Sequence, residues 1–126
     1  MVGHAFRVLP GTYAVCRLAP ETARPAWAAG DFVSVTATAE EVSVICPAKS
    51  VPSDVRAERE WRVLKVAGPF SLDTVGVLAA LAAPLATAKV SLLAVGTFDT
   101  DYLLVKADAL DAASRALTDA GHQRLD

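Results

Sequence analysis

The sequence predicts an α+β protein of the ferredoxin-like class, built from βαββαβ units whose antiparallel sheets carry helices on one face. In the second half of the chain, short apolar strands alternate with helical periodicity in the order strand-helix-strand-strand-helix. The connection between the first two of these strands is long enough for the right-handed crossover that such a unit requires. The first half carries a weaker copy of the same pattern, offset by about 60 residues.

The second half begins with a predicted strand over 61–67, where branched apolar residues dominate and a Gly-Pro pair follows. Ser71 is then expected to cap a helix, with Asp73 in its first turn. Pro84 should bend this helix or end it soon afterwards. The apolar stripe expected to be buried consists of Leu72, Val75, Leu78 or Ala79, Ala82 and Leu85.

A hairpin and a second helix complete this half. A buried strand is predicted over 90–95, a turn over 96–101 and an antiparallel return strand over 102–105. Asp108 and Asp111 are placed to start the second helix. Its buried face is expected to consist of Leu110, Ala113 and Leu117, with Gly121 as its stop.

No strand is predicted after the second helix, although a complete unit needs one. Residues 6–9, which precede a Pro-Gly pair, are the predicted donor of this missing edge strand.

The first half is expected to contain one strand, a short helix and a hairpin. These are predicted over 12–18, over 22–29, and over 32–35 with 42–45 around a turn at 38–41. Residues 47–60 are polar and read as a linker rather than a strand. We therefore expect an N-terminal unit with its linker over 1–58 and a C-terminal domain over 59–126.

Composition excludes several classes of protein. The chain has 126 residues, 53% of them hydrophobic, which is enough for a core without disulfides. A net charge of −2 without a Lys/Arg cluster argues against nucleic acid as a partner. The apolar stretches are too short to span a membrane, and we expect a soluble, cytoplasmic protein. Cys16 and Cys46 lie in apolar strands and are expected to be buried thiols.

The sequence offers no support for catalysis. Nucleotide-binding, hydrolase and metalloprotease motifs are absent, and His4 and His122 stand at opposite ends of the chain without metal-ligand spacing. Both histidines are expected to be solvated. No cofactor or metal is expected, and an enzyme is the least favoured class.

Two turns are the candidate site. The strand-to-helix turn over 68–76 offers backbone N–H groups for a carboxylate, and Gly68 and Gly76 are expected where backbone and ligand approach each other closely. The turn over 96–101 holds two acids and two hydroxyls that could accept an amine or a guanidinium. The two turns can face each other in a βαββ unit. The alternative is an ordinary capped turn beside a hairpin whose acids only form the turn.

The strings over 61–71, 74–81 and 90–105 together resemble one subfamily of ACT domains, found in small bacterial proteins and in animal cytosolic arginine sensors. The resemblance covers about residues 60–122 and implies tandem ACT-like units. Amino acids usually bind in this family where the strand-helix turn of one unit meets a neighbouring unit. The first half departs from the pattern, because its expected helix is short and no equivalent turn precedes it.

The resemblance also implies the site residues. The main-chain end of a ligand would lie against Phe70, Ser71, Thr74, Val75, Gly76 and Val77. Thr97 and Phe98 would contribute backbone groups, and Asp101 would bind a cationic side chain.

These observations favour a non-enzymatic sensor of a small molecule, namely an amino acid with a preference for a cationic side chain. The alternative is a dimerisation or protein-docking module without a ligand. A homodimer is expected in either case because the mean hydropathy is high for so short a chain.

Overall fold

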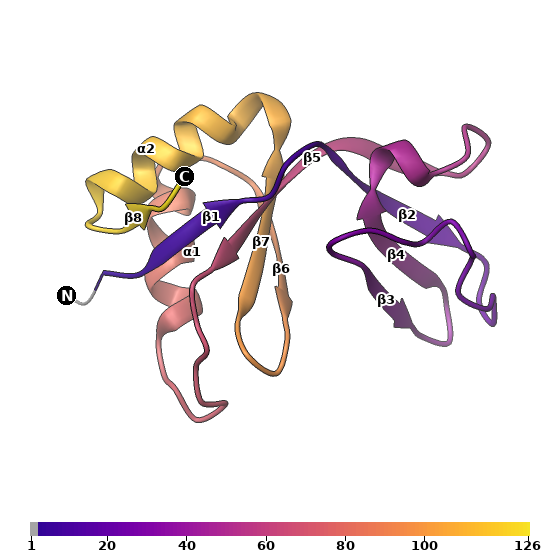
Figure 1. The fold of residues 1–126 in the computed structure, drawn as a ribbon, viewed down its shortest axis with the longest axis horizontal. Helices are drawn as coiled ribbons and strands as arrows, with labels where there is room; N and C mark the ends of the chain where they lie inside the picture. Colours follow the sequence, from indigo (N-terminus) through magenta and orange to yellow (C-terminus); the bar gives the residue numbers. More distant parts are fainter. Residues whose placement is uncertain (1–2) are drawn as a thin grey trace. The chain divides into compact units, whose positions relative to one another are not determined.

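The computed structural model describes residues 3–126, which fall into two compact units (Figure 1). The helical unit comprises Met1–Pro10 and Arg62–Asp126, and the strand unit comprises Gly11–Trp61. Strand β5 (Ala57–Val66) runs through the boundary between them. These units differ from the expected single boundary at residue 58, because the N-terminal segment up to Pro10 belongs to the same unit as the C-terminal half.

The helical unit has the ferredoxin-like α+β architecture that the sequence predicts. Besides β5, it contains β1 (Ala5–Val8), α1 (Val77–Thr87), β6 (Leu92–Gly96), β7 (Asp101–Lys106), α2 (Leu110–Asp119) and β8 (Gln123–Arg124). Its strands lie in the order β6-β7-β5-β1-β8. Strand β1 is antiparallel to β5 and parallel to β8.

Both helices cover the same face of this sheet (Figure 1). Helix α1 buries Leu81 and Leu85 there, and α2 buries Leu117, all with no exposed surface. They meet core side chains from three strands, namely Phe6 and Val8 of β1, Leu64 and Val66 of β5, and Leu103 and Val105 of β7. Full burial of such a side chain contributes about 1.5–3 kcal/mol to the free energy of folding.

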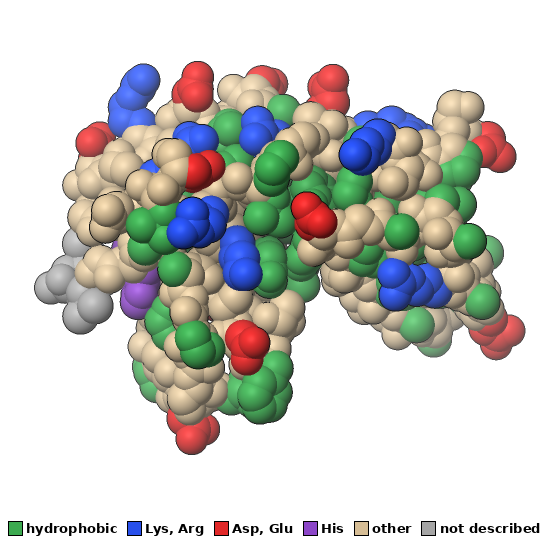
Figure 2. Space-filling view, viewed as in Figure 1, with side chains coloured by type: hydrophobic (Ala, Val, Ile, Leu, Met, Phe, Trp, Pro, Cys, Tyr) green, Lys and Arg blue, Asp and Glu red, His purple; other side chains and the backbone are tan. Residues whose placement is uncertain are grey.

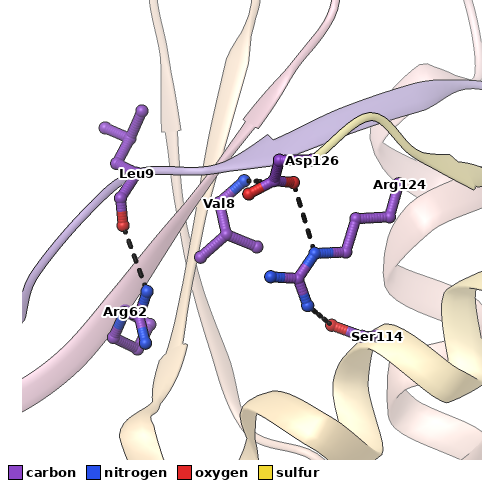
Figure 3. Close-up of polar contacts among 6 residues, drawn as sticks. All are labelled: Val8, Leu9, Arg62, Ser114, Arg124 and Asp126. Carbon is purple, nitrogen blue, oxygen red and sulfur yellow. Dashed lines mark hydrogen bonds and ion pairs between the residues drawn. The ribbon is translucent and has the colours of Figure 1, made fainter.

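The N-terminal segment completes the sheet, as predicted, but does not form its edge. Phe6 pairs with Val66, and the Arg62 guanidinium donates to the carbonyl oxygen of Leu9 at 3.3 Å (Figure 3). The short strand β8 lies outside β1, and the Leu125 N–H donates to the Phe6 carbonyl oxygen at 2.9 Å. The prediction of an edge strand is wrong because a strand too short for a periodic signal follows α2.

Polar contacts tie the last residues to β1 and α2 (Figure 3). One Asp126 side-chain oxygen accepts from the Val8 N–H at 3.3 Å and from Arg124 Nε at 3.2 Å. Arg124 also donates to the Ser114 hydroxyl at 3.2 Å. Slight burial opposes ionisation of Asp126, but these hydrogen bonds outweigh it and lower the pKa of its carboxyl group.

Helix α1 begins later than predicted. Ser71 closes a turn instead of capping the helix, because its hydroxyl accepts from the Asp73 N–H at 3.2 Å and its carbonyl from the Thr74 N–H at 2.9 Å. Gly76, with φ of 89°, then separates this turn from the helix that starts at Val77. Two apolar residues expected in the buried stripe are therefore 70% and 94% exposed, namely Leu72 and Val75.

Pro84 lies inside α1, and the helix ends three residues later at Thr87, as predicted. Proline has no N–H, so the carbonyl oxygen of Ala80 loses its normal partner. His122 replaces it, with Nε2 at 3.0 Å from that oxygen, while its Nδ1 accepts from the His4 N–H at 3.0 Å. These partners select the neutral imidazole protonated on Nε2. The expectation of a solvated residue is wrong for His122, which is only 4% exposed.

Helix α2 buries the predicted face, namely Leu110, Ala113 and Leu117. Asp108, the expected cap, lies in the short 3₁₀ turn before the helix, whereas Asp111 lies in the first turn of α2 as expected. Strand β6 was expected to be buried but is mostly exposed, because it lies at the edge of the sheet beyond β7. Neither helix in residues 3–126 is long and apolar enough to cross a membrane.

The strand unit contains β2 (Tyr13–Leu18), β3 (Ser34–Ala37), β4 (Val42–Pro47) and the first part of β5, in the order β3-β4-β2-β5. The predicted hairpin is confirmed by the antiparallel pairing of β3 with β4. The predicted linker is wrong at its end, because residues 57–60 belong to β5 and Ala57 pairs with Cys16.

The short helix expected over 22–29 does not form, and this segment consists of turns and irregular backbone. Pro25 interrupts it, and Gly30 follows it with φ of 142°. The Arg24 guanidinium bonds to the carbonyl oxygen of Ala28 at 2.7 and 3.2 Å, which gives this loop an alternative to helical hydrogen bonds. Ala28 is buried in the core of the strand unit.

The two cysteines are free and buried in that core, as predicted. Burial, reinforced by the neighbouring Cys46 and partly offset by Arg59, raises the pKa of Cys16 to about 11. Burial also raises the pKa of Cys46. Neither thiol is therefore activated as a nucleophile.

Candidate functional site

A cleft of about 250 Å³ lies in the helical unit, between the turn that precedes α1 and the turn that joins β6 to β7. These are the two turns that the sequence singles out. Every predicted site residue except Val75 lines the cleft, namely Phe70, Ser71, Thr74, Gly76, Val77, Thr97, Phe98 and Asp101.

Hydrogen bonds hold the two turns together. The Phe70 N–H donates to the Asp99 carbonyl oxygen at 2.7 Å. The Thr100 hydroxyl, which is buried, donates to the Val66 carbonyl oxygen at 2.7 Å. The first bond joins the two turns and the second fixes the β6–β7 turn to the end of β5, so the walls of the cleft form one connected structure.

The two glycines of the first turn have different roles. A Cβ at Gly68 would lie 3.0 Å from the Asp99 carbonyl oxygen and 3.2 Å from the Phe70 nitrogen, so other protein atoms approach closely here. A Cβ at Gly76 would meet no protein atom within 4 Å, so no other part of the protein approaches closely there, and the approach of a ligand stays a prediction. Gly76 is suited to its position by its positive φ.

The β6–β7 turn is closed by its threonines. The carbonyl oxygen of Thr100 accepts from the Thr97 N–H at 2.9 Å and from the Thr97 hydroxyl at 2.8 Å. The same hydroxyl accepts from the Thr100 N–H at 3.3 Å. The side chains of Asp99 and Asp101 take no part in these bonds, so their carboxylates are not needed to form the turn.

The start of α1 supplies the opposite chemistry. No side chain caps the helix, and its first intrahelical bond runs from Ala80 N–H to the Gly76 carbonyl oxygen. The N–H groups of Val77, Leu78 and Ala79 therefore have no partner within the helix. Together with the helix dipole, they favour an anion such as a carboxylate.

The apolar wall at Phe70 is supported by His4, the residue before β1. The Phe70 ring contacts the His4 ring edge to face, with centroids 5.7 Å apart, and His4 stacks on His122 at the same separation. Ring contacts and the hydrogen bond between His4 and His122 thus connect the wall of the cleft to His122, which binds the Ala80 carbonyl oxygen in α1.

Sequence reasoning missed five residues of the lining, namely Leu72, Leu78, Ala79, Asp99 and Thr100. Asp99 and Thr100 lie within the turn predicted over 96–101, so their place in that turn could have identified them as lining residues. Leu78 and Ala79 line the cleft because α1 begins at Val77, and this start could not be read from the capping pattern. Among residues 3–126, no group of three or more His, Cys, Asp or Glu side chains could hold a metal ion.

Comparison with known families matches the helical unit to one of them. A family model described as an ACT domain matches residues 56–119, and a model of an N-terminal domain from another family matches residues 11–54. The human cytosolic arginine sensor for mTORC1 subunit 1 is 32% identical over 74 residues, which cover 55% of this chain. The chain spans only 22% of the length of that curated relative.

Solved structures match nearly the whole chain. A crystallised protein from Agrobacterium tumefaciens is 37% identical, with a TM-score of 0.93 over 99% of this chain and 94% of that chain. The regulatory subunit of aspartate kinase from Thermus thermophilus is 12% identical, with a TM-score of 0.61 over 95% of this chain and 98% of that chain. At this identity the second match shows a common fold alone.

Proposed function

Because this chain belongs to the ACT-domain family, which is regulatory rather than catalytic, we propose that it is a sensor of a free amino acid bound in the cleft beside α1. One observation carries the proposal: free helical N–H groups face a turn with unused carboxylates. An amino acid carries a carboxylate and an amine, which these groups complement. The cleft volume of about 250 Å³ suits a ligand smaller than a drug.

In this arrangement, the ligand carboxylate binds the N–H groups at the start of α1. Ser71 and Thr74 supply hydroxyls beside it, and the rings of Phe70 and Phe98 flank the ligand. Val75 lies outside the lining and is 94% exposed, so its part in binding would require the turn to fold inward.

We assign the ligand's side chain to Asp101. This residue begins β7 in the same alternation as Leu103 and Val105, and therefore points to the helix-covered side of the sheet, into the cleft. A carboxylate favours a guanidinium or ammonium group, because a charge-assisted hydrogen bond is about twice as strong as a neutral one. The arginine bound by the curated sensor, according to its name, agrees with this preference.

A thermal-denaturation screen with the twenty free amino acids tests the proposal. A ligand at 100 times its Kd should increase the free energy of unfolding by about 2.7 kcal/mol. We expect arginine or lysine to stabilise the protein most. If no amino acid changes the melting temperature, the sensor function is rejected.

Calorimetric titration of Asp101→Asn then tests the assignment of the side chain. Affinity for arginine and lysine should fall roughly 10- to 150-fold, while a neutral amino acid of similar length should bind as before. Asp108→Asn is the matched control, since it removes an exposed acid outside the cleft in the same unit. Equal losses for cationic and neutral ligands would contradict the role of Asp101.

A second candidate function is docking of a second copy, as in a homodimer. Three apolar side chains near the cleft are strongly exposed: Leu72 at 70%, Val75 at 94% and Phe98 at 79%. Such an exposed apolar group favours a protein interface. Sedimentation of the unmodified protein and of Val75→Asp, with and without arginine, tests whether a dimer forms through this surface. A dimer that persists in Val75→Asp would contradict this use of the surface.

A further inference from the structure

A second cleft, of about 410 Å³, lies in the helical unit beside the β1–β5 pair. Its charged lining residues are Arg7, Lys65 and Asp99, and the proposed amino-acid cleft shares only Asp99 and Thr100 with it. Alternation along the strands places Arg7 and Lys65 on the face of the sheet away from the helices, since Phe6, Val8, Leu64 and Val66 point into the core.

Arg7 and Lys65 stand directly opposite each other. They form one antiparallel cross-strand pair, two residues from the Ala5–Ala67 position where the Ala67 N–H donates to the Ala5 carbonyl oxygen. Their Cα atoms are therefore separated by about 5.5 Å, the spacing of a hydrogen-bonded pair. Like charges in this position destabilise a sheet.

Asp99 lines the same cleft, but no carboxylate among residues 3–126 forms an ion pair with Arg7 or Lys65. Both side chains are exposed, and neither makes a hydrogen bond or an ion pair with another of residues 3–126. Figure 2 shows basic side chains close together over the region of β1 and β5. The positive charge is therefore concentrated at the cleft and available to an anion.

We propose that this cleft binds a small molecule that carries a phosphate group, with the phosphate on Arg7 and Lys65. A phosphate monoester carries about −1.5 to −2 charges at neutral pH, which matches two adjacent cations better than one carboxylate does. The Arg7 guanidinium can bind two phosphate oxygens, and Lys65 supplies a compact second charge.

The rest of the lining selects what the phosphate is attached to. Thr100 donates its one hydroxyl hydrogen to the Val66 carbonyl oxygen, so towards a ligand it can only accept, and Asp99 adds a carboxylate acceptor to this lining. Pro69 and Leu125 are apolar. The preferred ligand is accordingly a phosphate monoester with a hydroxyl or amine on its other end, rather than free phosphate.

Calorimetry at constant ionic strength, with glycerol 3-phosphate, inorganic phosphate and glycerol as probes, tests the proposal. We expect saturable binding of glycerol 3-phosphate, weaker binding of phosphate and none of glycerol. Arg7→Gln and Lys65→Gln should each weaken binding roughly 10- to 150-fold. Arg115→Gln, an exposed cation on α2, is the matched control and should bind normally.

Absence of saturable binding, or an equal loss in Arg115→Gln, would overturn the site. Equal affinity for phosphate and glycerol 3-phosphate would overturn the role of Asp99. Arginine binding in Arg7→Gln should be unchanged, so failure of this site is distinguishable from failure of the sensor function.

Lys65→Glu supplies a test that does not depend on one probe. It replaces the repulsive pair with an ion pair, so the melting temperature in phosphate-free buffer should rise while glycerol 3-phosphate binding disappears. A melting temperature that stays the same or falls would contradict the unrelieved repulsion from which the site is inferred.

Discussion

The two units cover their apolar strands in different ways. In the helical unit, α1 and α2 lie over one face of the sheet and bury residues at three- to four-residue spacing. In the strand unit, loop residues complete the core, with Ala28 and Val51 packed among Val44 and Cys46. The strand patterns of the two halves are similar in sequence, so alternation in a strand does not determine what covers it.

The difference explains where the candidate site lies. A helix with a free N-terminus beside a hairpin turn creates the cleft in the helical unit. The strand unit has a hairpin but no α-helix among its residues, and so lacks the N–H groups that would receive a carboxylate. The candidate site therefore depends on the helices that cover the sheet as well as on the hairpin turn.

Phe6→Ala should have the largest effect and should fall on the helical unit, despite its place near the N-terminus. Phe6 is 1% exposed in the core beneath the helices, and removal of such a side chain costs about 3–5 kcal/mol. Far-ultraviolet circular dichroism follows the helical unit, because both α-helices belong to it, and tryptophan fluorescence follows the strand unit, which holds Trp27 and Trp61.

Urea denaturation should therefore shift more by circular dichroism than by fluorescence in Phe6→Ala. Val44→Ala, a core substitution in the strand unit, is the matched control and should show the reverse. If both probes shift equally in both variants, the two units unfold as one.

His122→Phe should reduce stability by about 2–4 kcal/mol. The substitution leaves the Ala80 carbonyl oxygen and the His4 N–H without their partners, and each unsatisfied buried group costs about 1–3 kcal/mol. Pro84→Ala restores an N–H for Ala80, so His122→Phe should cost about 1 kcal/mol less in that background. Additive effects in this double-mutant cycle, measured by urea denaturation, would show that His122 does not compensate for Pro84.

Gly68→Ala and Gly76→Ala should separate crowding from backbone strain. Gly76→Ala should cost about 1 kcal/mol through its positive φ, because its Cβ has free space. Gly68→Ala should instead push the two turns apart, since its Cβ meets backbone atoms of both. We expect arginine affinity, measured by calorimetry, to fall more in Gly68→Ala. A greater loss in Gly76→Ala would place the ligand against that residue.

Cys16 should give the smallest effect, a decline in stability at alkaline pH. Its pKa of about 11 in the folded protein lies above the ordinary thiol value of 9.0, so the folded state binds more protons than the unfolded state between these values. Stability of the strand unit should therefore be complete below about pH 9 and fall as the pH rises toward 11. Tryptophan fluorescence during urea denaturation measures this fall, and Cys16→Ala should reduce it; an identical fall would assign it to other groups.

The sequence predicts the parts of the fold that local periodicity controls. Both hairpins and the buried face of α2 are confirmed, as are the two turns that form the cleft and the strands other than β8 and the first residues of β5. The start of α1 was missed, because the hydroxyl of Ser71 suits a turn as well as a helix cap and only the φ of Gly76 distinguishes them. The role of His122 also has no local signal, since its partners lie more than 40 residues away, at positions 4 and 80.

The participation of residues 1–10 in the helical unit has a consequence for the order of folding. Leu9 bonds to Val63, although the whole strand unit separates them in sequence, and within that unit Tyr13 pairs with Trp61. If the strand unit forms first, the loop to be closed between β1 and β5 shrinks from about fifty residues to a few, which lowers the entropic cost by about 2 kcal/mol. The paired strands of the strand unit would then determine the register of β1 against β5 in the helical unit. During refolding, the tryptophan fluorescence should therefore recover before the circular dichroism signal of the helices.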